Sequence, residues 1–457
     1  MSVRNWSGAR AGEAKSRRGL LRGAALSAVA LLGAACGATS GGDGEATGAS
    51  PELGPLSLWW WNEQDLLKET EDEIMRDWPS RFPRVTLQPV KVPYAQMAVK
   101  MVTSLAADDV PDVSFTHQDW VAPFAQKQVF RPLDDLARKD SALKLPDYYP
   151  AALDFHRWKG KLYGLTWLME GSTLFYNKNL LEKAGLADPR ELDRRGQWTL
   201  ERFRDYLPRL SGGSADQRTW GWNQGVTGKL SNWVDSIWQF GGEAFSADGL
   251  KLTLHQPASV EALEWRVGHY KSRITVAGDP EGAGVAMNSG RLGFLRANRL
   301  HTFDLDPNGR WGQVLLPLGK NGQRWHRAGC SAHGIVARSK QEGASWELVK
   351  YLSRQGNRFA MLRNNANPLW PAVAGGKEYA ASMRSWEDAE SFIQLGKQIR
   401  VMQPPPGPLS GEAVAGWLGY VAIDAWMKRV IAGEVGVRDG MEQAARECDQ
   451  IVAEAMR

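Results

Sequence analysis

The sequence predicts an α/β protein built around a parallel β-sheet. Short apolar runs that end in polar residues alternate with segments whose apolar residues recur at steps of three and four. Such alternation of strand and helix is typical of parallel sheets with right-handed crossovers. The chain has 457 residues, of which 43% are hydrophobic and 23% charged. The composition excludes a disordered or fibrous protein, and the length suits two or three domains.

The first five elements are predicted in order from the residue pattern. Leu56–Trp61 is an apolar run followed by polar residues, as in a buried strand. Residues 65–78 place apolar side chains on one helical face, and a strand is expected over 85–92. A second helix is expected over 94–106 and a third strand over 111–115.

Polar and aromatic residues follow the first and third of these strands. Ligands of parallel sheets bind just beyond the carboxyl ends of the strands. This rule places seven residues in a cleft: Trp60, Trp61, Asn62, Glu63, Gln118, Asp119 and Trp120.

The N-terminal 35 residues have the pattern of an export signal. A basic start with Arg17 and Arg18 precedes the apolar run 24–32, which is too short to span a bilayer. The paired arginines resemble the twin-arginine signal, and an ordinary Sec signal is the alternative. Cys36 stands where a bacterial lipoprotein carries its lipid, although Gly33 replaces the usual aliphatic residue. Residues 36–55, rich in glycine and small polar residues, are expected to form a flexible tether.

The basic character of the chain resides in this signal. Residues 1–35 contain six of the 56 Lys and Arg and one of the 51 Asp and Glu, so residues 36–457 contain 50 of each. The formal charge of +5 is therefore no argument for a nucleic-acid partner.

The cysteines do not indicate a metal or redox centre. Cys36, Cys330 and Cys448 lack zinc or redox spacing, and we predict no metal or cofactor. In an exported protein a Cys330–Cys448 bridge is one option, but the pattern favours two unpaired buried thiols.

From residue 56 to the C-terminus, the order of segments resembles the extracellular solute-binding proteins of carbohydrate ABC importers, the group that includes maltose-binding protein. The Tyr-Asn-Lys sequence and the Trp-Thr-Leu-Glu-Arg-Phe helix start are two of its features. The stretches that carry the resemblance are Ala107–Val113, Leu174–Leu186, Trp198–Phe203, Gly241–Phe245, Ser259–Leu263 and Ala344–Leu352.

The resemblance implies two α/β lobes joined by a hinge, with a ligand cleft between them. The first lobe is expected over 56–169 and 311–365, and the second over 170–310 and 366–457. It further implies a monomeric transport receptor without catalysis, whose closed form docks on a membrane permease. The receptor would be exported and held at the cell surface or in the periplasm by a lipid on Cys36.

Carbohydrate binding requires aromatic platforms for the sugar faces and carboxylates or amides for the hydroxyls. The resemblance aligns Asp119 and Glu170 with acidic hydroxyl acceptors. It places Trp417 and Tyr420 near an aromatic platform and directs Trp370 toward the cleft.

The 21 tryptophans need to be divided between core and cleft. Trp78, Trp265 and Trp346 lie at helical spacing among apolar residues and are predicted to be core. Trp233 and Trp238 fit either role. Those at strand or loop ends are predicted platforms: Trp60, Trp61, Trp120, Trp167 and Trp222.

Two alternatives to a sugar receptor stay open. Asp119 and Glu170 could form the carboxylate pair of a carbohydrate-active enzyme. The ligand could also be a non-sugar solute such as a peptide or a polyamine. Asn298 and Arg299 stand where the family often has a stacking tryptophan, so an acidic or phosphorylated sugar is a further option.

Overall fold

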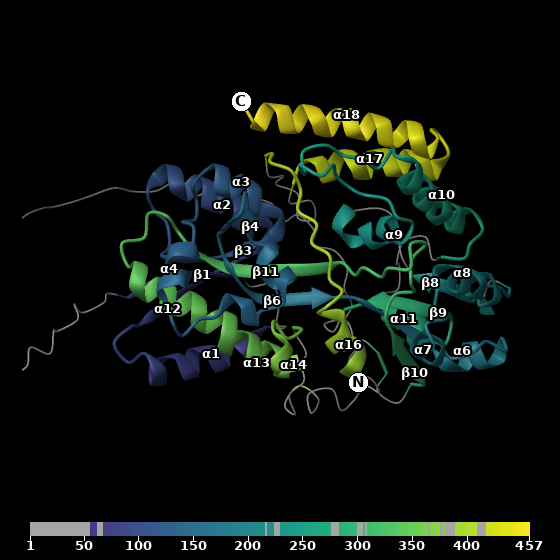
Figure 1. Ribbon diagram of the computed structural model, residues 1–457, viewed down its shortest axis with the longest axis horizontal. Coiled ribbons are helices and arrows are strands. Elements are labelled where there is room, and N and C mark those ends of the chain that lie inside the picture. Colours follow the sequence, from purple (N-terminus) through teal and green to yellow (C-terminus); the bar gives the residue numbers. More distant parts are fainter. Residues whose placement is uncertain are drawn as a thin grey trace, which may run out of the picture. The chain divides into compact units, whose positions relative to one another are not determined.

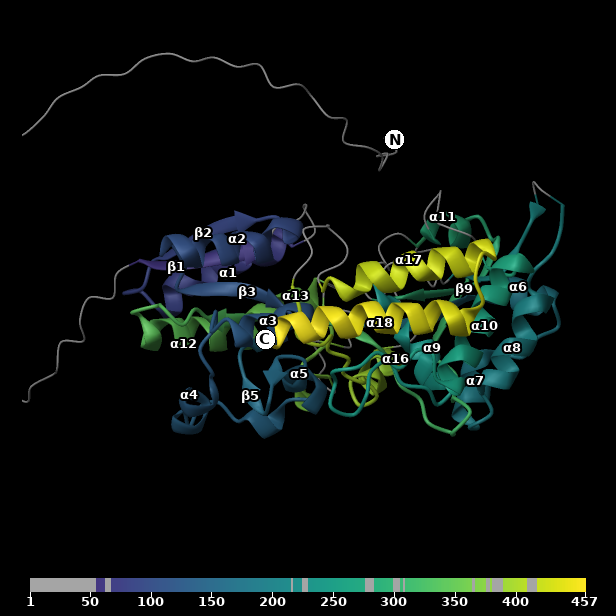
Figure 2. The ribbon, with the colours of Figure 1, turned by 90° about the horizontal axis from the view of Figure 1, so that it is seen from above.

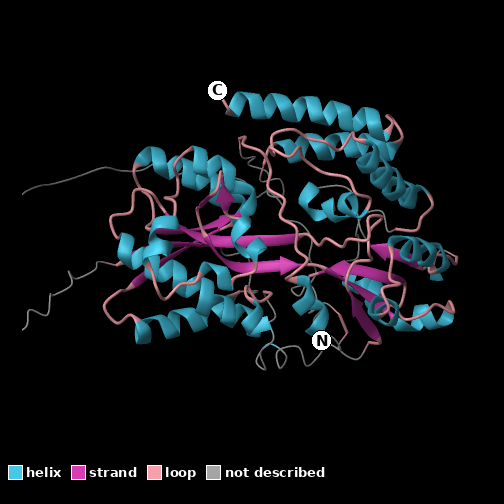
Figure 3. Cartoon of the chain, in the orientation of Figure 1, coloured by secondary structure: helices cyan, strands magenta, loops and turns pink. Residues whose placement is uncertain are grey.

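The computed structural model shows two lobes, each built on its own β-sheet (Figures 1 and 3). The residues that it describes are 55–61, 67–214, 217–223, 229–275, 283–298, 305–306, 309–363, 366–374, 379, 389–408 and 417–457. Cys36, Asn62, Glu63 and Arg299, together with the predicted signal and residues 36–54 of the predicted tether, lie outside these residues. Within the described ranges, no helix is both long enough and apolar enough to cross a bilayer.

The sheet of the first lobe has five strands in the order β2-β1-β3-β11-β6. They are β1 (Leu56–Trp61), β2 (Leu87–Val92), β3 (Val113–His117), β6 (Leu165–Gly171) and β11 (Ala328–Ile335). β1 pairs in parallel with β2 and β3, as the sequence predicts. β11 is antiparallel to both β3 and β6, so the sheet as a whole is mixed.

Helices cover both faces of this sheet (Figure 1). The two predicted helices are present as α1 (Lys68–Arg81) and α2 (Tyr94–Ala107). Because side chains alternate along a strand, Trp60 packs in the core that contains α1, whereas Trp59 packs in the core that contains α2. The other helices of this lobe are α3 (Val121–Gln126), α4 (Asp134–Lys139), α5 (Pro150–Asp154), α12 (Glu342–Tyr351), α13 (Asn357–Leu362) and α14 (Pro371–Ala374), and a short hairpin joins β4 (Arg157–Trp158) to β5 (Lys161–Leu162).

The sheet of the second lobe has four strands in the order β10-β7-β9-β8. They are β7 (Thr173–Asn177), β8 (Trp220–Asn223), β9 (Leu292–Ala297) and β10 (Trp311–Val314). β8 and β9 are parallel, and β7 is antiparallel to β9 and β10.

The helices of the second lobe pack around this sheet and form a separate apolar core. The last two helices, α17 (Gly419–Ala432) and α18 (Val437–Ala455), pack side by side along this core (Figure 2). The others are α6 (Lys178–Lys183), α7 (Pro189–Arg194), α8 (Leu200–Arg209), α9 (Val234–Gln239), α10 (Pro257–Lys271) and α11 (Ala283–Asn288), while α16 (Ala389–Leu395) contacts β7.

Two of the predicted lobe boundaries differ from the strand pairing and packing. Residues 311–314 form β10, which pairs with β7 in the second sheet and not with the first. Residues 366–370 belong with the first lobe, since Asn367 donates its backbone N–H to Met169 at 2.8 Å and Tyr149 donates to Leu369 at 2.9 Å. These pairings join residues far apart in sequence, so no local pattern indicates them.

His326 ties together three described segments that lead from one lobe to the other. Its neutral ring bonds the Ser172 carbonyl, between β6 and β7, at 2.9 Å. Its backbone pairs with Gln398 and Arg400, each at 2.9 Å, on the segment that follows α16. Burial lowers the pKa of His326 to about 3, so the ring stays neutral and donates from Nδ1. The hydrogen bonds of His326 therefore hold together the segments that connect the two lobes.

Two of the recognisable sequence stretches begin helices of the second lobe. Asn177 in the Tyr-Asn-Lys sequence accepts the Leu180 N–H at 3.2 Å and thereby caps α6. Thr199 caps α8 by accepting the Arg202 N–H at 3.3 Å. These residue types therefore have a local structural role that does not depend on a ligand.

Candidate functional site

Asp119 lies just beyond the carboxyl end of β3, where the strand rule predicts a cleft. It belongs to the short turn Gln118–Trp120 and is fully buried. Lys229 Nζ donates to Asp119 Oδ2 at 3.1 Å, and the Tyr420 hydroxyl donates to Oδ1 at 3.4 Å. Lys229 and Tyr420 belong to the second lobe, so Asp119 is contacted across the boundary between the lobes.

The contact between Asp119 and Lys229 is a carboxylate–ammonium pair. Burial raises the pKa of Asp119, but Lys229 and His117 outweigh this effect and hold the pKa below its usual range. The pKa of Lys229 is raised above its usual value because Asp119 and Tyr94 outweigh the effect of burial. Lys229 Nζ also donates to the Tyr94 hydroxyl at 3.2 Å. The closed arrangement leaves no exposed Asp119 carboxylate for a ligand.

Glu170 forms a second contact across the lobe boundary. It is the penultimate residue of β6, and its Oε2 accepts from Asn298 Nδ2, just after β9, at 3.1 Å. Burial raises the pKa of Glu170 to about 7, an effect that Arg327 partly opposes. The structure thus brings two of the predicted ligand residues together.

Basic residues lie close to both acids. Arg296 near the end of β9 donates from Nε to Asp235 Oδ2 at 2.7 Å, and both side chains are almost completely buried. Arg327 directly precedes β11 and is close enough to Arg296, Asp235 and Glu170 for each to affect its pKa. We call the group Asp119, Lys229, Tyr420, Glu170, Asn298, Arg296, Asp235 and Arg327 the interlobe layer.

Trp60 and Trp167 pack together in the core of the first lobe. Their ring centroids are 5.0 Å apart, and the His333 ring lies 5.2 Å from Trp60 and 5.3 Å from Trp167. Both indole N–H groups are buried and have no hydrogen-bond partner among the described residues. These two predicted platforms therefore form one aromatic group with unused donors.

Trp61 and Trp120 both pack against Tyr94 on the opposite face of the first sheet. Their rings lie 6.1 Å and 5.0 Å from the ring of Tyr94. Since Tyr94 also contacts Lys229, this second aromatic group adjoins the Asp119 contact. Trp120 is 2% exposed and Trp61 is half-buried.

Trp417 and Tyr420 lie together, with ring centroids 5.4 Å apart, and both are buried. Trp233 is also fully buried, in the same core of the second lobe. Trp238 packs there too, with the Arg400 guanidinium 5.2 Å from its ring.

Two predicted platforms lie elsewhere. Trp222 faces the helices of the second lobe, where its N–H donates to His269 Nδ1 at 3.2 Å and Trp265 packs 5.4 Å away. Trp370 is half-buried against Tyr148 of the first lobe, at 5.3 Å. In β8 the alternation of side chains turns Trp222 toward the core. Trp78 and Trp346 are core residues, as predicted.

The sequence did not reveal Tyr94, His117, Lys229 or Arg327 as parts of this site. Tyr94 follows β2 and His117 ends β3, so the strand rule could have found both. Lys229 and Asp119 are 110 residues apart in sequence, so no local pattern indicates their contact.

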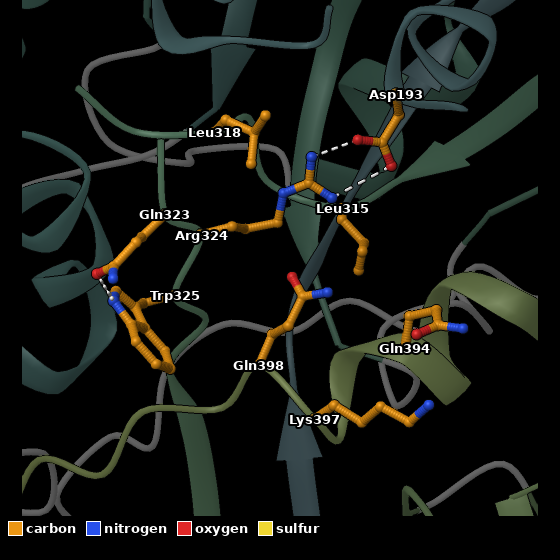
Figure 4. Close-up of a pocket in the computed structure, with 9 residues that line it drawn as sticks. All are labelled: Asp193, Leu315, Leu318, Gln323, Arg324, Trp325, Gln394, Lys397 and Gln398. Atoms are coloured by element: carbon orange, nitrogen blue, oxygen red, sulfur yellow. Dashed lines mark hydrogen bonds and ion pairs between the residues drawn. The ribbon is translucent and has the colours of Figure 1, made fainter. Parts of the chain in front are cut away.

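A separate cavity of about 570 Å³ lies against α7 and α16 (Figure 4). It is lined by Asp193, Leu315, Leu318, Gln323, Arg324, Trp325, Gln394, Lys397 and Gln398. Arg324 pairs with Asp193 at its wall, and Trp325 donates to Gln323 at 3.3 Å. It contains no sequence-predicted site residue and no member of the interlobe layer, so we regard the interlobe layer as the candidate site.

The interlobe layer supplies charged acceptors and charged donors from both lobes, and the rings of Trp61, Tyr94 and Trp120 adjoin it. Such a set can bind a polar ligand that has several hydrogen-bonding groups and apolar faces. Among the described residues, no three His, Cys, Asp or Glu side chains are grouped so that they could hold a metal.

Several proteins of known structure or sequence are similar to this chain. The ABC substrate-binding protein of Listeria monocytogenes in complex with cycloalternan aligns over 87% of this chain and 99% of its own, with a TM-score of 0.72 at 17% identity. The sugar-binding protein MalE of Xanthomonas citri aligns over 88% and 98%, with a TM-score of 0.71 at 18% identity. A binding protein of Brucella abortus is 22% identical over 64% of this chain and 70% of its own.

These similarities agree with the two-lobed fold. The family model described as bacterial extracellular solute-binding protein matches residues 63–358, which is more than half of the chain. The chain therefore belongs to the bacterial extracellular solute-binding proteins.

Proposed function

We propose that this chain is the carbohydrate-binding component of an ABC importer. It captures a mono- or oligosaccharide between its lobes and delivers it to a membrane permease. The observation that carries this proposal is the interlobe layer, in which Asp119 and Glu170 are contacted from the second lobe and Asp119 adjoins the aromatic group of Trp61, Tyr94 and Trp120.

The chemistry of these groups suits a sugar. Carboxylates and amides bond hydroxyl groups, and indole faces cover the apolar C–H faces of a pyranose ring. The buried N–H groups of Trp60 and Trp167, which have no described partner, are donors that a ligand oxygen could use. Similar folds include proteins whose structures were solved with cycloalternan and with maltotriose.

Ligand capture requires the lobes to separate first. Asp119 is fully buried behind Lys229 and Tyr420, so a sugar reaches it only when these second-lobe residues move away. Rotation of the lobes about the junction at His326 would open the layer, and closure on the sugar would follow.

The remaining features complete the proposal. The export signal over 1–35 would carry the chain out of the cytoplasm, through the twin-arginine or the Sec route. A lipid on Cys36 and the tether over 36–55 would hold the folded part at the membrane. It would act as a monomer, and its closed form would dock on the permease.

Binding of sugars to purified residues 37–457 tests the proposal. Trp61 and Trp120 pack against Tyr94, which contacts Lys229 of the interlobe layer, so ligand entry is expected to change the fluorescence. Calorimetric titration with a panel of neutral and acidic mono- and oligosaccharides then gives the affinities. If no sugar of the panel binds but peptides or polyamines do, the ligand is a non-sugar solute.

One observation favours a second candidate function. The pKa of Glu170 is raised to about 7 while that of Asp119 is held low, and such divergence is found in the acid and base of glycosidases. A carbohydrate-active enzyme would cleave a chromogenic glycoside panel and lose this activity in Glu170→Gln. The transport proposal expects no cleavage by the wild-type protein.

A further inference from the structure

Arg327 is fixed at the junction of the lobes. It follows His326, whose ring and backbone bond two other interlobe segments, and it precedes Ala328, which pairs with Gly171 at the end of β6. This backbone therefore has little freedom, and the Arg327 side chain starts from a fixed point in the interlobe layer.

The charge of Arg327 is not paired within the described part of the chain. Its Nε is buried and has no hydrogen-bond partner there, and none of the described acids forms an ion pair with it. Burial and the neighbouring Arg296 lower the pKa of Arg327 to about 9, and the opposing effects of Asp235, Glu170 and Asp119 are smaller than these.

The acids around Arg327 have other partners. Asp119 pairs with Lys229 at 3.1 Å, and Asp235 pairs with Arg296. Glu170 accepts from Asn298, and its raised pKa of about 7 leaves it partly protonated at neutral pH. Among the described residues of the layer, the carboxylates of Asp119 and Asp235 are therefore already ion-paired and Glu170 already accepts from Asn298, so the Arg327 guanidinium has no acidic partner of its own.

A buried charge is costly unless an opposite charge or several hydrogen bonds compensate for it. We propose that the ligand captured between the lobes is an anionic sugar, bearing one carboxylate or one phosphate, and that the Arg327 guanidinium receives this group. The inference rests on the proposed function, since it specifies the ligand of the same layer. A guanidinium suits both anions because its planar fork donates two parallel N–H bonds to them.

The alternative is that Arg327 bonds the hydroxyl groups of a neutral sugar. The two possibilities differ in the effect of charge on the affinity. An anion gains from the uncompensated cation, whereas a hydroxyl gains only an ordinary charge-assisted hydrogen bond.

Matched ligands separate these cases in calorimetric titrations of residues 37–457. The panel contains neutral oligosaccharides, the same chains ending in a uronic acid, and sugar phosphates. We expect the best anionic ligand to bind at least about tenfold more tightly than its neutral counterpart, because a charge-assisted bond contributes about that much. Preference for the carboxylate or for the phosphate identifies which anion the layer takes.

Substitutions at Arg327 then assign the preference to this side chain. Arg327→Gln is expected to remove most of the affinity difference between the acidic and neutral ligands, and Arg327→Lys to retain part of it. The matched control is Arg338→Gln, since Arg338 is exposed and pairs with Asp108 at 2.7 Å, away from the layer. It is expected to retain the wild-type preference.

The outcomes distinguish the two proposals. Equal affinity for neutral and acidic sugars in the wild-type protein would overturn the anionic ligand and leave the sugar receptor intact. If the Arg327→Gln variant is folded, as judged by circular dichroism, and still prefers acidic ligands, another residue is responsible for the preference. If no sugar of any charge binds, the proposed function itself is wrong.

Discussion

Lys229 of the second lobe and Asp119 of the first lobe form an ion pair with an Nζ–Oδ2 distance of 3.1 Å. The Lys229 side chain is 11% exposed and that of Asp119 is fully buried. The ammonium group therefore occupies the place beside Asp119 that we assign to a ligand hydroxyl. Because the two partners belong to different lobes, separation of the lobes would break this pair and expose the Asp119 carboxylate.

Lys229→Met is expected to shift the ligand-free protein toward the open conformation. The substitution leaves the Asp119 carboxylate buried without its cation, which costs about 3 to 5 kcal/mol in the closed form. Opening the lobes returns the carboxylate to water. Small-angle X-ray scattering of residues 37–457 should therefore give a larger radius of gyration for the variant than for the wild-type protein.

A lysine in an exposed pair provides the control for this effect. Lys68 and Asp72 lie one helical turn apart in α1, and their side chains are 60% and 54% exposed. Lys68→Met is expected to leave the scattering curve unchanged, because exposed pairs contribute little. Identical scattering from Lys229→Met and the wild-type protein would mean that the ion pair does not hold the lobes together.

Asp119→Asn is expected to weaken binding of the preferred sugar by roughly tenfold to a hundredfold, the range for a hydrogen bond to a charged group. The amide keeps the shape of the carboxylate but loses its charge and one acceptor. Calorimetric titration measures the change, with the exposed Asp109→Asn as the control. Unchanged affinity would remove Asp119 from the binding site.

Cys330 and Cys448 are free and buried, as the sequence favours. Burial raises the pKa of the Cys330 thiol above its usual range and that of Cys448 to about 12, so neither forms a reactive thiolate at neutral pH. Residues 37–457 should react slowly with a thiol reagent when folded and expose two thiols in denaturant. A count of zero in denaturant would indicate a disulfide.

The sequence predicted the parts of the fold that depend on local periodicity. The strand–helix order from β1 to β3 follows from apolar runs and helical spacing, and Asp119 follows from the rule for strand ends. The place of β10 was not predictable in this way, because its pairing with β7 joins residues 311–314 to 174–177.

The candidate site was predictable only in part for a similar reason. A position at a strand end does not decide which face a side chain takes, so Trp222 could not be told from Trp60 by sequence alone. In the structure Trp222 contacts His269, whereas Trp60 contacts Trp167. Arg327 carries no local signal either, since its surroundings come from both lobes.

Glu170 is expected to make the stability of the protein depend on pH. Burial raises its pKa from 4.5 to about 7. A carboxyl whose pKa is higher in the folded state binds more protons when folded, so its contribution is fully present below about pH 4.5 and declines up to about pH 7. Asp119, whose pKa is lowered, has the opposite effect. Its stabilising contribution is present at neutral pH and is lost as the pH falls below the usual pKa of an aspartate.

Glu170→Gln isolates the first of these effects. The variant lacks the ionisable group, so its stability relative to the wild-type protein should rise by about 3 kcal/mol between about pH 4.5 and about pH 8. Urea unfolding at several pH values measures this difference, with the exposed Glu264→Gln as the control. A constant difference across this range would show that Glu170 titrates normally, as it would if the lobes were open and water reached its carboxyl group.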